Sequence, residues 1–183
     1  MASAKKQSKA ISSAKRILKK YANQRLPIKV ETIAKDLGAS ITYDPFSDDP
    51  TVSAMLYRDS KRTVIGVNSL NSIERQRFSI AHEIGHLVLH DGEVYVDRNA
   101  KVNFRDQRSS MAIDPEEIEA NAFAAELLMP SDLVNSETKR FVGANPSTAP
   151  QILIEALANK FKVSARAMDF RLQNLHLIVS IDP

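Results

Sequence analysis

The five residues His82-Glu83-Ile84-Gly85-His86 constrain this chain more than any other stretch, because they fit the pattern H-E-x-x-H. On a helix, residues i and i+4 lie one above the other on the same face, so both imidazoles can bind one metal ion. Glu83 lies about 100° around the helix from His82, where its carboxylate can reach a water on that ion. The flanking residues continue a helical apolar pattern, and we expect a helix from about Ser72 to His90.

Two further features of this helix favour a metal site over a coincidence on an ordinary core helix. A buried helix has little use for two inward-facing histidines unless something satisfies their ring nitrogens. Gly85 in a helix interior costs about 1 kcal/mol relative to alanine. We therefore expect another element, or a substrate, to approach Gly85 closely.

A catalytic zinc ion usually takes three protein ligands and leaves one position for water. The chain has no cysteine, so the third ligand must be a histidine or a carboxylate. His90 follows His82 by two helical turns, about 12 Å along the axis, which is too far for both to bind one ion. His176 lies in a nearly apolar tail, where a packed or surface histidine is the simpler interpretation. A carboxylate is therefore needed.

The best source of this carboxylate is the acidic helix predicted to begin at Asp114-Pro115 and to continue to Met129. Glu117 lies on the stripe of this helix that we expect to face inward, and it is the favoured third ligand. Glu119 is the alternative. Asn121, four residues after Glu117, could steady a ligand from behind.

The position of Glu117 also has a plainer explanation, because it stands three residues after Asp114 and could complete a capping box. Glu119 and Glu126 are seven residues apart, on a side of the helix that we expect to be solvated. The choice between Glu117 and Glu119 rests on this helical-face argument alone.

The strand predicted at Thr63–Val67 directly precedes the motif helix, and its β-branched residues favour an extended conformation. If this strand forms the edge of a sheet, the backbone of Ile65 and Val67 could pair with an extended substrate. The alternative is a central strand that is paired on both sides and has only a structural role.

The rest of the chain alternates predicted helices and strands within one domain. The N-terminal 30 residues carry nine basic residues and no acidic one, whereas the whole chain has a net charge of +3. We expect residues 1–10 to be a flexible basic arm and residues 11–183 to form a single domain with a helical C-terminal part at about 150–178. The other predicted elements are helices at Ser12–Asn23, Val30–Leu37, Ile152–Phe161 and Ala165–Leu175, strands at Ser40–Tyr43 and Val52–Arg58, a polar loop at Asp97–Ile113, and a polar connection at 131–150 with a short helix near Leu133.

Composition indicates where such a protein works. No stretch approaches the roughly 20 apolar residues that span a bilayer, and no apolar signal-peptide core is present near the N-terminus. We expect a cytoplasmic protein without membrane contact. A basic arm can contact nucleic acid, but a solvated terminus is the simpler interpretation, and direct nucleic-acid binding is not expected.

Two long motifs resemble the ImmA/IrrE family of metallopeptidases. The first is RQRFSIAHEIGHLVLH at residues 75–90, and the second is EIEANAFAAELLMP at residues 117–130. Weaker similarity extends to residues 26–38 and from residue 157 onward, so that about 150 residues are covered. The resemblance implies a zincin-like α+β fold, with a small, mostly antiparallel sheet packed against the motif helix and further helices.

The resemblance also implies an activity. His82 and His86 would be metal ligands, a glutamate of the second motif would be the third ligand, and Glu83 would be the general base. The expected metal is Zn²⁺, with another divalent ion such as Mn²⁺ as an alternative. The expected substrate is a helix-turn-helix repressor of a phage, a mobile element or a stress regulon.

A different class of function stays open at this point: a non-catalytic binding module of a toxin–antitoxin or phage system that uses the same fold. An intact Glu83 argues against this alternative, because a purely structural metal site needs no general base. The residue that would stabilise the oxyanion is not identified, and Arg105 and His90 are candidates only because they are polar and close to the motifs in sequence.

Overall fold

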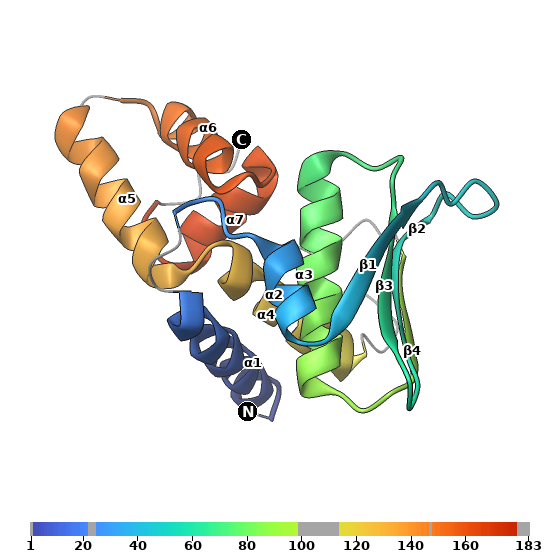
Figure 1. Ribbon diagram of the computed structural model, residues 1–183. Coiled ribbons are helices and arrows are strands. Elements are labelled where there is room, and N and C mark those ends of the chain that lie inside the picture. The colour runs from blue at the N-terminus through green and yellow to red at the C-terminus, as the bar shows by residue number, and fades with distance from the viewer. Residues whose placement is uncertain (1, 22–24, 99–113, 147, 179–183) are drawn as a thin grey trace.

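A computed structural model describes residues 2–21, 25–98, 114–146 and 148–178 of the protein. The long helix α3 (Ile73–Leu89) lies at its centre, between a four-stranded sheet on one side and a group of helices on the other (Figure 1). This α+β arrangement is the predicted one. No described helix is long and apolar enough to cross a membrane.

The sheet contains the strands β1 (Ala39–Asp44), β2 (Val52–Arg58), β3 (Thr63–Asn68) and β4 (Val94–Arg98), in the order β1-β3-β2-β4. Strand β1 is parallel to β3, whereas the β2–β3 and β2–β4 pairs are antiparallel, as a mostly antiparallel sheet requires. The turn between β2 and β3 is closed by the Asp59 N–H, which donates to the Arg62 carbonyl oxygen at 3.0 Å.

The prediction that Ile65 and Val67 lie on an edge strand is wrong. Strand β3 is paired on both sides, with Ile41 of β1 and Leu56 of β2 opposite Ile65, and both Ile65 and Val67 are fully buried. The β-branched residues of this run indicated an extended conformation, but they carried no information about its neighbours, because β1 pairs with it from more than twenty residues away. The outer strands of the described sheet are β1 and β4.

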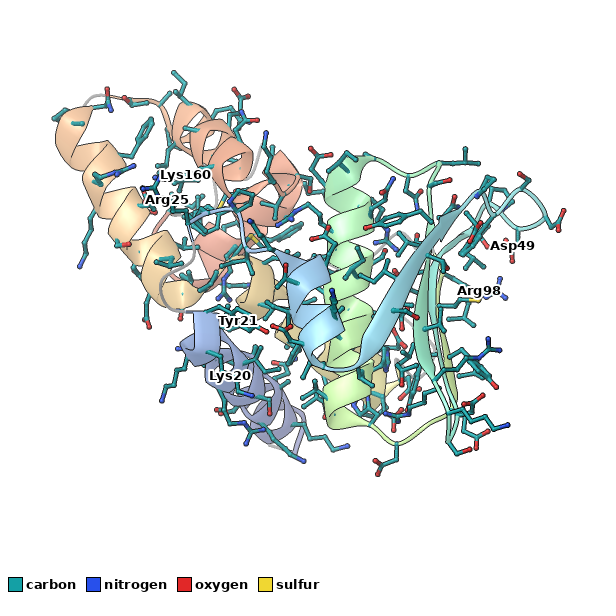
Figure 2. The ribbon with its side chains drawn as sticks, viewed as in Figure 1. Lys20, Tyr21, Arg25, Asp49, Arg98 and Lys160 are labelled. Atoms are coloured by element: carbon teal, nitrogen blue, oxygen red, sulfur yellow. The ribbon has the colours of Figure 1, made fainter. Side chains whose placement is uncertain are left out.

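Strand β4 was not predicted, and its last two residues fall in the stretch that we expected to be a polar loop. Asp97 of β4 accepts hydrogen bonds from the Arg75 guanidinium at 3.0 Å and from the Ser79 hydroxyl at 2.8 Å, which ties the strand to α3. Arg98 pairs with Asp49 of the β1–β2 loop (Figure 2). Residues 99–113 of the predicted loop, including Arg105, lie outside the described residues.

Two of the helices on the other side of α3 differ from the predicted ones. Helix α1 begins at Ala2 rather than near Ser12, so residues expected to form a flexible arm are helical. Helix α5 is a full helix where the sequence indicated a polar connection with one short helix. Its sequence showed no apolar helical pattern, because Val134 and Thr138 are its only buried residues. The helices are α1 (Ala2–Leu18), the short 3₁₀ helix η1 (Lys19–Tyr21), α2 (Val30–Asp36), α4 (Pro115–Leu128), α5 (Ser131–Ala144), α6 (Pro150–Phe161) and α7 (Ala165–Asn174).

Helix α3 is fixed at both ends by side chains. The Ser72 hydroxyl caps its N-terminus by accepting a hydrogen bond from the Arg75 N–H at 3.3 Å. At its C-terminus the Arg58 guanidinium donates to the carbonyl oxygens of Leu87, His90 and Gly92. These bonds satisfy carbonyl groups that have no partner at a helix end. The motif residues therefore sit on a helix that is tied directly to the sheet.

Candidate metal centre

Three side chains from two helices meet at one point. His82 and His86 project from the same face of α3, and their Nε2 atoms are 3.1 Å apart. Glu117 of α4 places Oε2 3.2 Å from His82 Nε2 and Oε1 3.1 Å from His86 Nε2. Ligand atoms on a tetrahedral zinc ion with bonds of about 2.0–2.1 Å lie roughly 3.3–3.4 Å apart. The three groups are therefore spaced as ligands of a single ion would be.

Gly85 explains how Glu117 reaches the histidines. A Cβ atom at this position would lie 3.0 Å from the Ala120 Cα and 3.2 Å from the Ala120 carbonyl oxygen. Helix α4 therefore crosses α3 in direct contact with the backbone at Gly85, one turn after Glu117. The close approach expected from the sequence is confirmed, and another helix makes it.

The hydrogen-bond partners of His82 indicate which of its ring nitrogens is free for a metal. His82 Nδ1 lies 3.1 Å from Asn121 Oδ1, an oxygen that can only accept. The proton of His82 must then be on Nδ1, which leaves the lone pair of Nε2 directed at the cluster. An outer partner that fixes the tautomer in this way is typical of metal-binding histidines. Asn121 thus occupies the supporting position expected for it.

The charges at the cluster also suit a cation. Partial burial would raise the pKa of Glu117, but its close contacts with the imidazoles of His82 and His86 outweigh this effect and hold that pKa well below its usual range. Burial lowers the pKa of His86, and the contact with Glu117 only partly offsets this effect. For His82, burial also lowers the pKa, but neighbouring carboxylates outweigh it and the net change is upward. An ionised carboxylate between two buried imidazoles provides the donor set that zinc prefers.

Glu83 is buried beside this cluster and is not one of its three members. Its side chain is 0% exposed, and among the described residues neither carboxylate oxygen makes a hydrogen bond of normal geometry; the Asp97 backbone lies near enough only to lower the pKa slightly against the effect of burial. Burial raises the pKa of Glu83 to about 8. A carboxyl group without a partner is costly in a protein interior, and a nearby cation would favour its ionised form. The geometry fits a group that acts on a metal-bound water and does not itself bind the ion.

Glu119 and His90 lie behind His86, on the side away from the cluster. His90 Nδ1 is 3.0 Å from His86 Nδ1, and Glu119 Oε2 is 3.5 Å from His90 Nε2. Glu119 is not in the His–His–Glu group, so its position does not support its role as the alternative ligand. His90 faces the opposite edge of the His86 ring, which removes it as an oxyanion donor.

Glu119 and Glu126 depart from the expectation for them, whereas His176 is the surface histidine that the sequence indicated. Glu119 and Glu126 were predicted on a solvated side of the acidic helix, but both are buried. Glu126 pairs with the buried guanidinium of Arg171, and its other oxygen accepts from the Ser131 N–H at 3.1 Å. His176 is exposed, has a positive φ of 56° and belongs to neither potential metal-binding group of the described residues.

Sequence reasoning missed Tyr95 of β4. Its ring stacks on the His86 ring with centroids 4.1 Å apart, and its hydroxyl donates to Glu116 at 3.2 Å. His86, His90 and Glu116 form a second group that could hold a metal ion. That group shares His86 with the His82–His86–Glu117 group, so the two groups compete for the same imidazole. No sequence signal could have found Tyr95, because only the pairing of β4 with β2 brings it to α3.

Comparison with known proteins relates most of the chain to one peptidase family. Residues 28–173 match the model of a peptidase family that is described as the IrrE N-terminal-like domain. This match includes both helices that form the cluster.

Two curated proteins are similar over part of their length. A protein of Bacillus phage phi105, named uncharacterized immunity region protein 2, is 38% identical over 78 residues, which are 42% of this chain and 44% of that protein. The radiation response metalloprotease IrrE of Deinococcus deserti is 38% identical over 84 residues, which are 45% of this chain and 28% of that protein. The chain thus spans less than half the length of either relative.

Proposed function

We propose that this chain, which belongs to the ImmA/IrrE family of metallopeptidases, is a metal-dependent endopeptidase that cleaves a protein substrate. The observation that carries the proposal is a buried Glu83 without a partner beside three correctly spaced ligand groups. A metal site with only a structural role would gain nothing from an unpaired buried carboxyl group, which costs free energy.

His82, His86 and Glu117 would hold the metal ion, for which Zn²⁺ is the first choice and Mn²⁺ an alternative. When bound, such an ion polarises a scissile carbonyl group and lowers the pKa of a water molecule towards 7. Asn121 keeps the His82 ring in the orientation and tautomer that the site requires.

Glu83 has the role of general base and then of general acid. Its carboxylate takes a proton from the attacking water and passes it to the leaving amine. The fully buried position excludes bulk water from the carboxyl group, which keeps the proton between the reacting groups. In the metal-free protein burial raises the pKa of this carboxyl to about 8, and a cation bound nearby would lower it, so that Glu83 could take a proton and give it back near pH 7.

The substrate strand is proposed to pair with β4 rather than with β3. The stacking of Tyr95 on His86 places β4 next to the cluster. The Arg58 N–H donates to the Glu93 carbonyl oxygen at 2.9 Å, so Arg58 and Glu93 form a hydrogen-bonded pair of the β2–β4 ladder. Hydrogen-bonded and non-hydrogen-bonded pairs alternate along an antiparallel ladder, so the pairs that contain Val94 and Val96 are non-hydrogen-bonded. The N–H groups of Val94 and Val96 therefore point away from β2. These groups could pair with an extended segment of a protein substrate.

The proposed substrate is a helix-turn-helix repressor of a phage, a mobile element or a stress regulon. The similarity to a phage protein named for its immunity region supports a regulatory setting of this kind. Pairing through the backbone would require the cleaved segment to be extended, such as a linker between folded parts. Direct binding of the chain to nucleic acid is not part of the proposal.

The test is to incubate the metal-loaded protein with the helix-turn-helix repressors encoded beside it and to analyse the products by mass spectrometry. A Glu83→Gln variant with equal metal content is the control, because glutamine keeps the volume but accepts no proton. We expect defined fragments with the wild type and none with the variant. Equal binding of a repressor by both proteins without cleavage would contradict the proposal and favour a regulatory binding module.

A further inference from the structure

The Nδ1 atom of His86, on the side of the ring away from the metal cluster, faces another histidine. For a metal-binding histidine the usual partner at this position is a carboxylate, a carbonyl oxygen or a water. His86 Nδ1 and His90 Nδ1 are 3.0 Å apart, and both side chains are buried. Two facing ring nitrogens can form a hydrogen bond only if one carries a proton and the other does not. The contact therefore couples the tautomers of the two rings.

Metal binding decides which nitrogen carries the proton, and this step rests on the proposed function. If His86 Nε2 holds the ion, the proton of the neutral His86 ring is on Nδ1. That N–H must donate to His90 Nδ1, which has to be unprotonated. The proton of a neutral His90 ring is then on Nε2, on the side where Glu119 lies.

Glu119 is placed to favour this tautomer of His90. Its Oε2 lies 3.5 Å from His90 Nε2, which is longer than a normal hydrogen bond but close enough for electrostatic attraction. His90 Nε2 has no hydrogen-bond partner among the described residues. Lys6 of α1 lies 3.6 Å from the other oxygen of Glu119, so Glu119 faces the N-terminal helix as well as His90.

We propose that His90 and Glu119 are positioning residues that hold His86 in its metal-binding tautomer. They touch neither the ion nor the substrate and act through the His86 ring alone. Together with Asn121 behind His82, they give each histidine ligand its own partner, one an amide and the other a histidine–carboxylate pair. Tyr95 covers the face of the same His86 ring and restricts its rotation.

The tautomers can be measured directly in zinc-loaded protein labelled with ¹⁵N-histidine. Long-range ¹H–¹⁵N spectra distinguish protonated, unprotonated and metal-bound ring nitrogens. We expect His86 to be protonated at Nδ1, and His90 to be protonated at Nε2 and unprotonated at Nδ1. A proton on His90 Nδ1 would overturn the proposal. This measurement uses the wild-type protein, so it does not depend on the folding of any variant.

Zinc affinity, measured by competition with a chromogenic chelator, supplies the second test. His90→Leu leaves the His86 N–H without an acceptor and should weaken zinc binding about 10- to 100-fold, as losses of outer partners do. His90→Asn places an amide oxygen near the position of Nδ1 and should bind zinc within about threefold of wild type. The matched control is His176→Leu, which removes an exposed histidine and should change nothing.

The outcomes separate the two proposals. A wild type that binds neither zinc nor manganese would overturn both. Normal zinc binding by the wild type and by His90→Leu would overturn the positioning role and leave the proposed function standing. Glu119→Leu and Glu119→Gln provide a further comparison, in which only the leucine variant should lose affinity, because glutamine keeps an acceptor oxygen.

Discussion

Gly85→Ala tests whether the crossing of α3 and α4 sets the geometry of the metal centre. The new methyl group would lie 3.0 Å from the Ala120 Cα, 3.2 Å from its carbonyl oxygen and 3.3 Å from a Phe123 ring carbon. Favourable contacts between carbon atoms begin at about 3.5 Å, so α4 must move away by roughly 0.5 Å. Glu117 is carried on the same helix, one turn before Ala120, and would move with it.

Two opposing effects determine the stability of this variant. Alanine gains about 1 kcal/mol of helix propensity over glycine. Overpacking of a close helix contact costs about 1–3 kcal/mol. We expect a net loss in the free energy of unfolding of the metal-free protein of about 0–2 kcal/mol. The displacement of Glu117 should cost more in function, with zinc affinity lowered about 10-fold or further.

The assay combines urea denaturation of the metal-free protein with zinc competition. Gly143→Ala is the matched control, because a methyl group added to this glycine of α5 would meet no atom within 4 Å. It should leave zinc affinity unchanged and raise stability by up to about 1 kcal/mol. If Gly85→Ala is stabilised as much as the control and binds zinc normally, the helix contact does not set the ligand geometry.

Four other outcomes are expected. Glu117→Gln should weaken zinc binding about 10-fold or more in a competition assay, because it replaces the only charged ligand. Asn121→Ala should weaken it by a similar factor without moving the ligands. Arg171→Leu should lower the free energy of unfolding by about 2–3 kcal/mol in urea, because buried Glu126 would lose its closest cation and keep only Lys15 at 3.9 Å and hydrogen bonds from Ser131. In the metal-free protein, the folded-state pKa of Glu83, about 8, exceeds its ordinary value of 4.5, so the unfolded carboxyl ionises first. The free energy of unfolding should therefore decrease as the pH rises from about 4.5 to about 8. Glu83→Gln should abolish this decrease.

The grouping of His82, His86 and Glu117 could be anticipated from sequence because it depends largely on local helical spacing. His82 and His86 are one turn apart on one helix. Glu117 was preferred because its stripe of the helix was expected to face inward, yet its side chain is 38% exposed, whereas Glu119 and Glu126 are buried. Helical periodicity does not report long-range pairing. For that reason the contact between His90 and Glu119 was missed, although His90 follows His86 by the same spacing as His86 follows His82.

The errors in the predicted fold have the same cause. The residues of β3 indicated a strand, but only pairing with β1 makes it central and leaves β4 at the edge. Strand β4 is five residues long and follows directly on a turn, so its alternation is too short to predict. Helix α5 buries only two residues, and its pattern is that of a polar connection. Helix α1 extends to Ala2 through a basic stretch whose lysines resemble a solvated terminus.

Anomalous diffraction from crystals of the zinc-loaded protein tests the central claim most directly. We predict one peak, about 2.0–2.2 Å from Nε2 of His82, from Nε2 of His86 and from an oxygen of Glu117, with Glu83 outside bonding distance. A peak bound instead by His90 and Glu116, or no ordered peak in protein that is otherwise folded, would contradict the account.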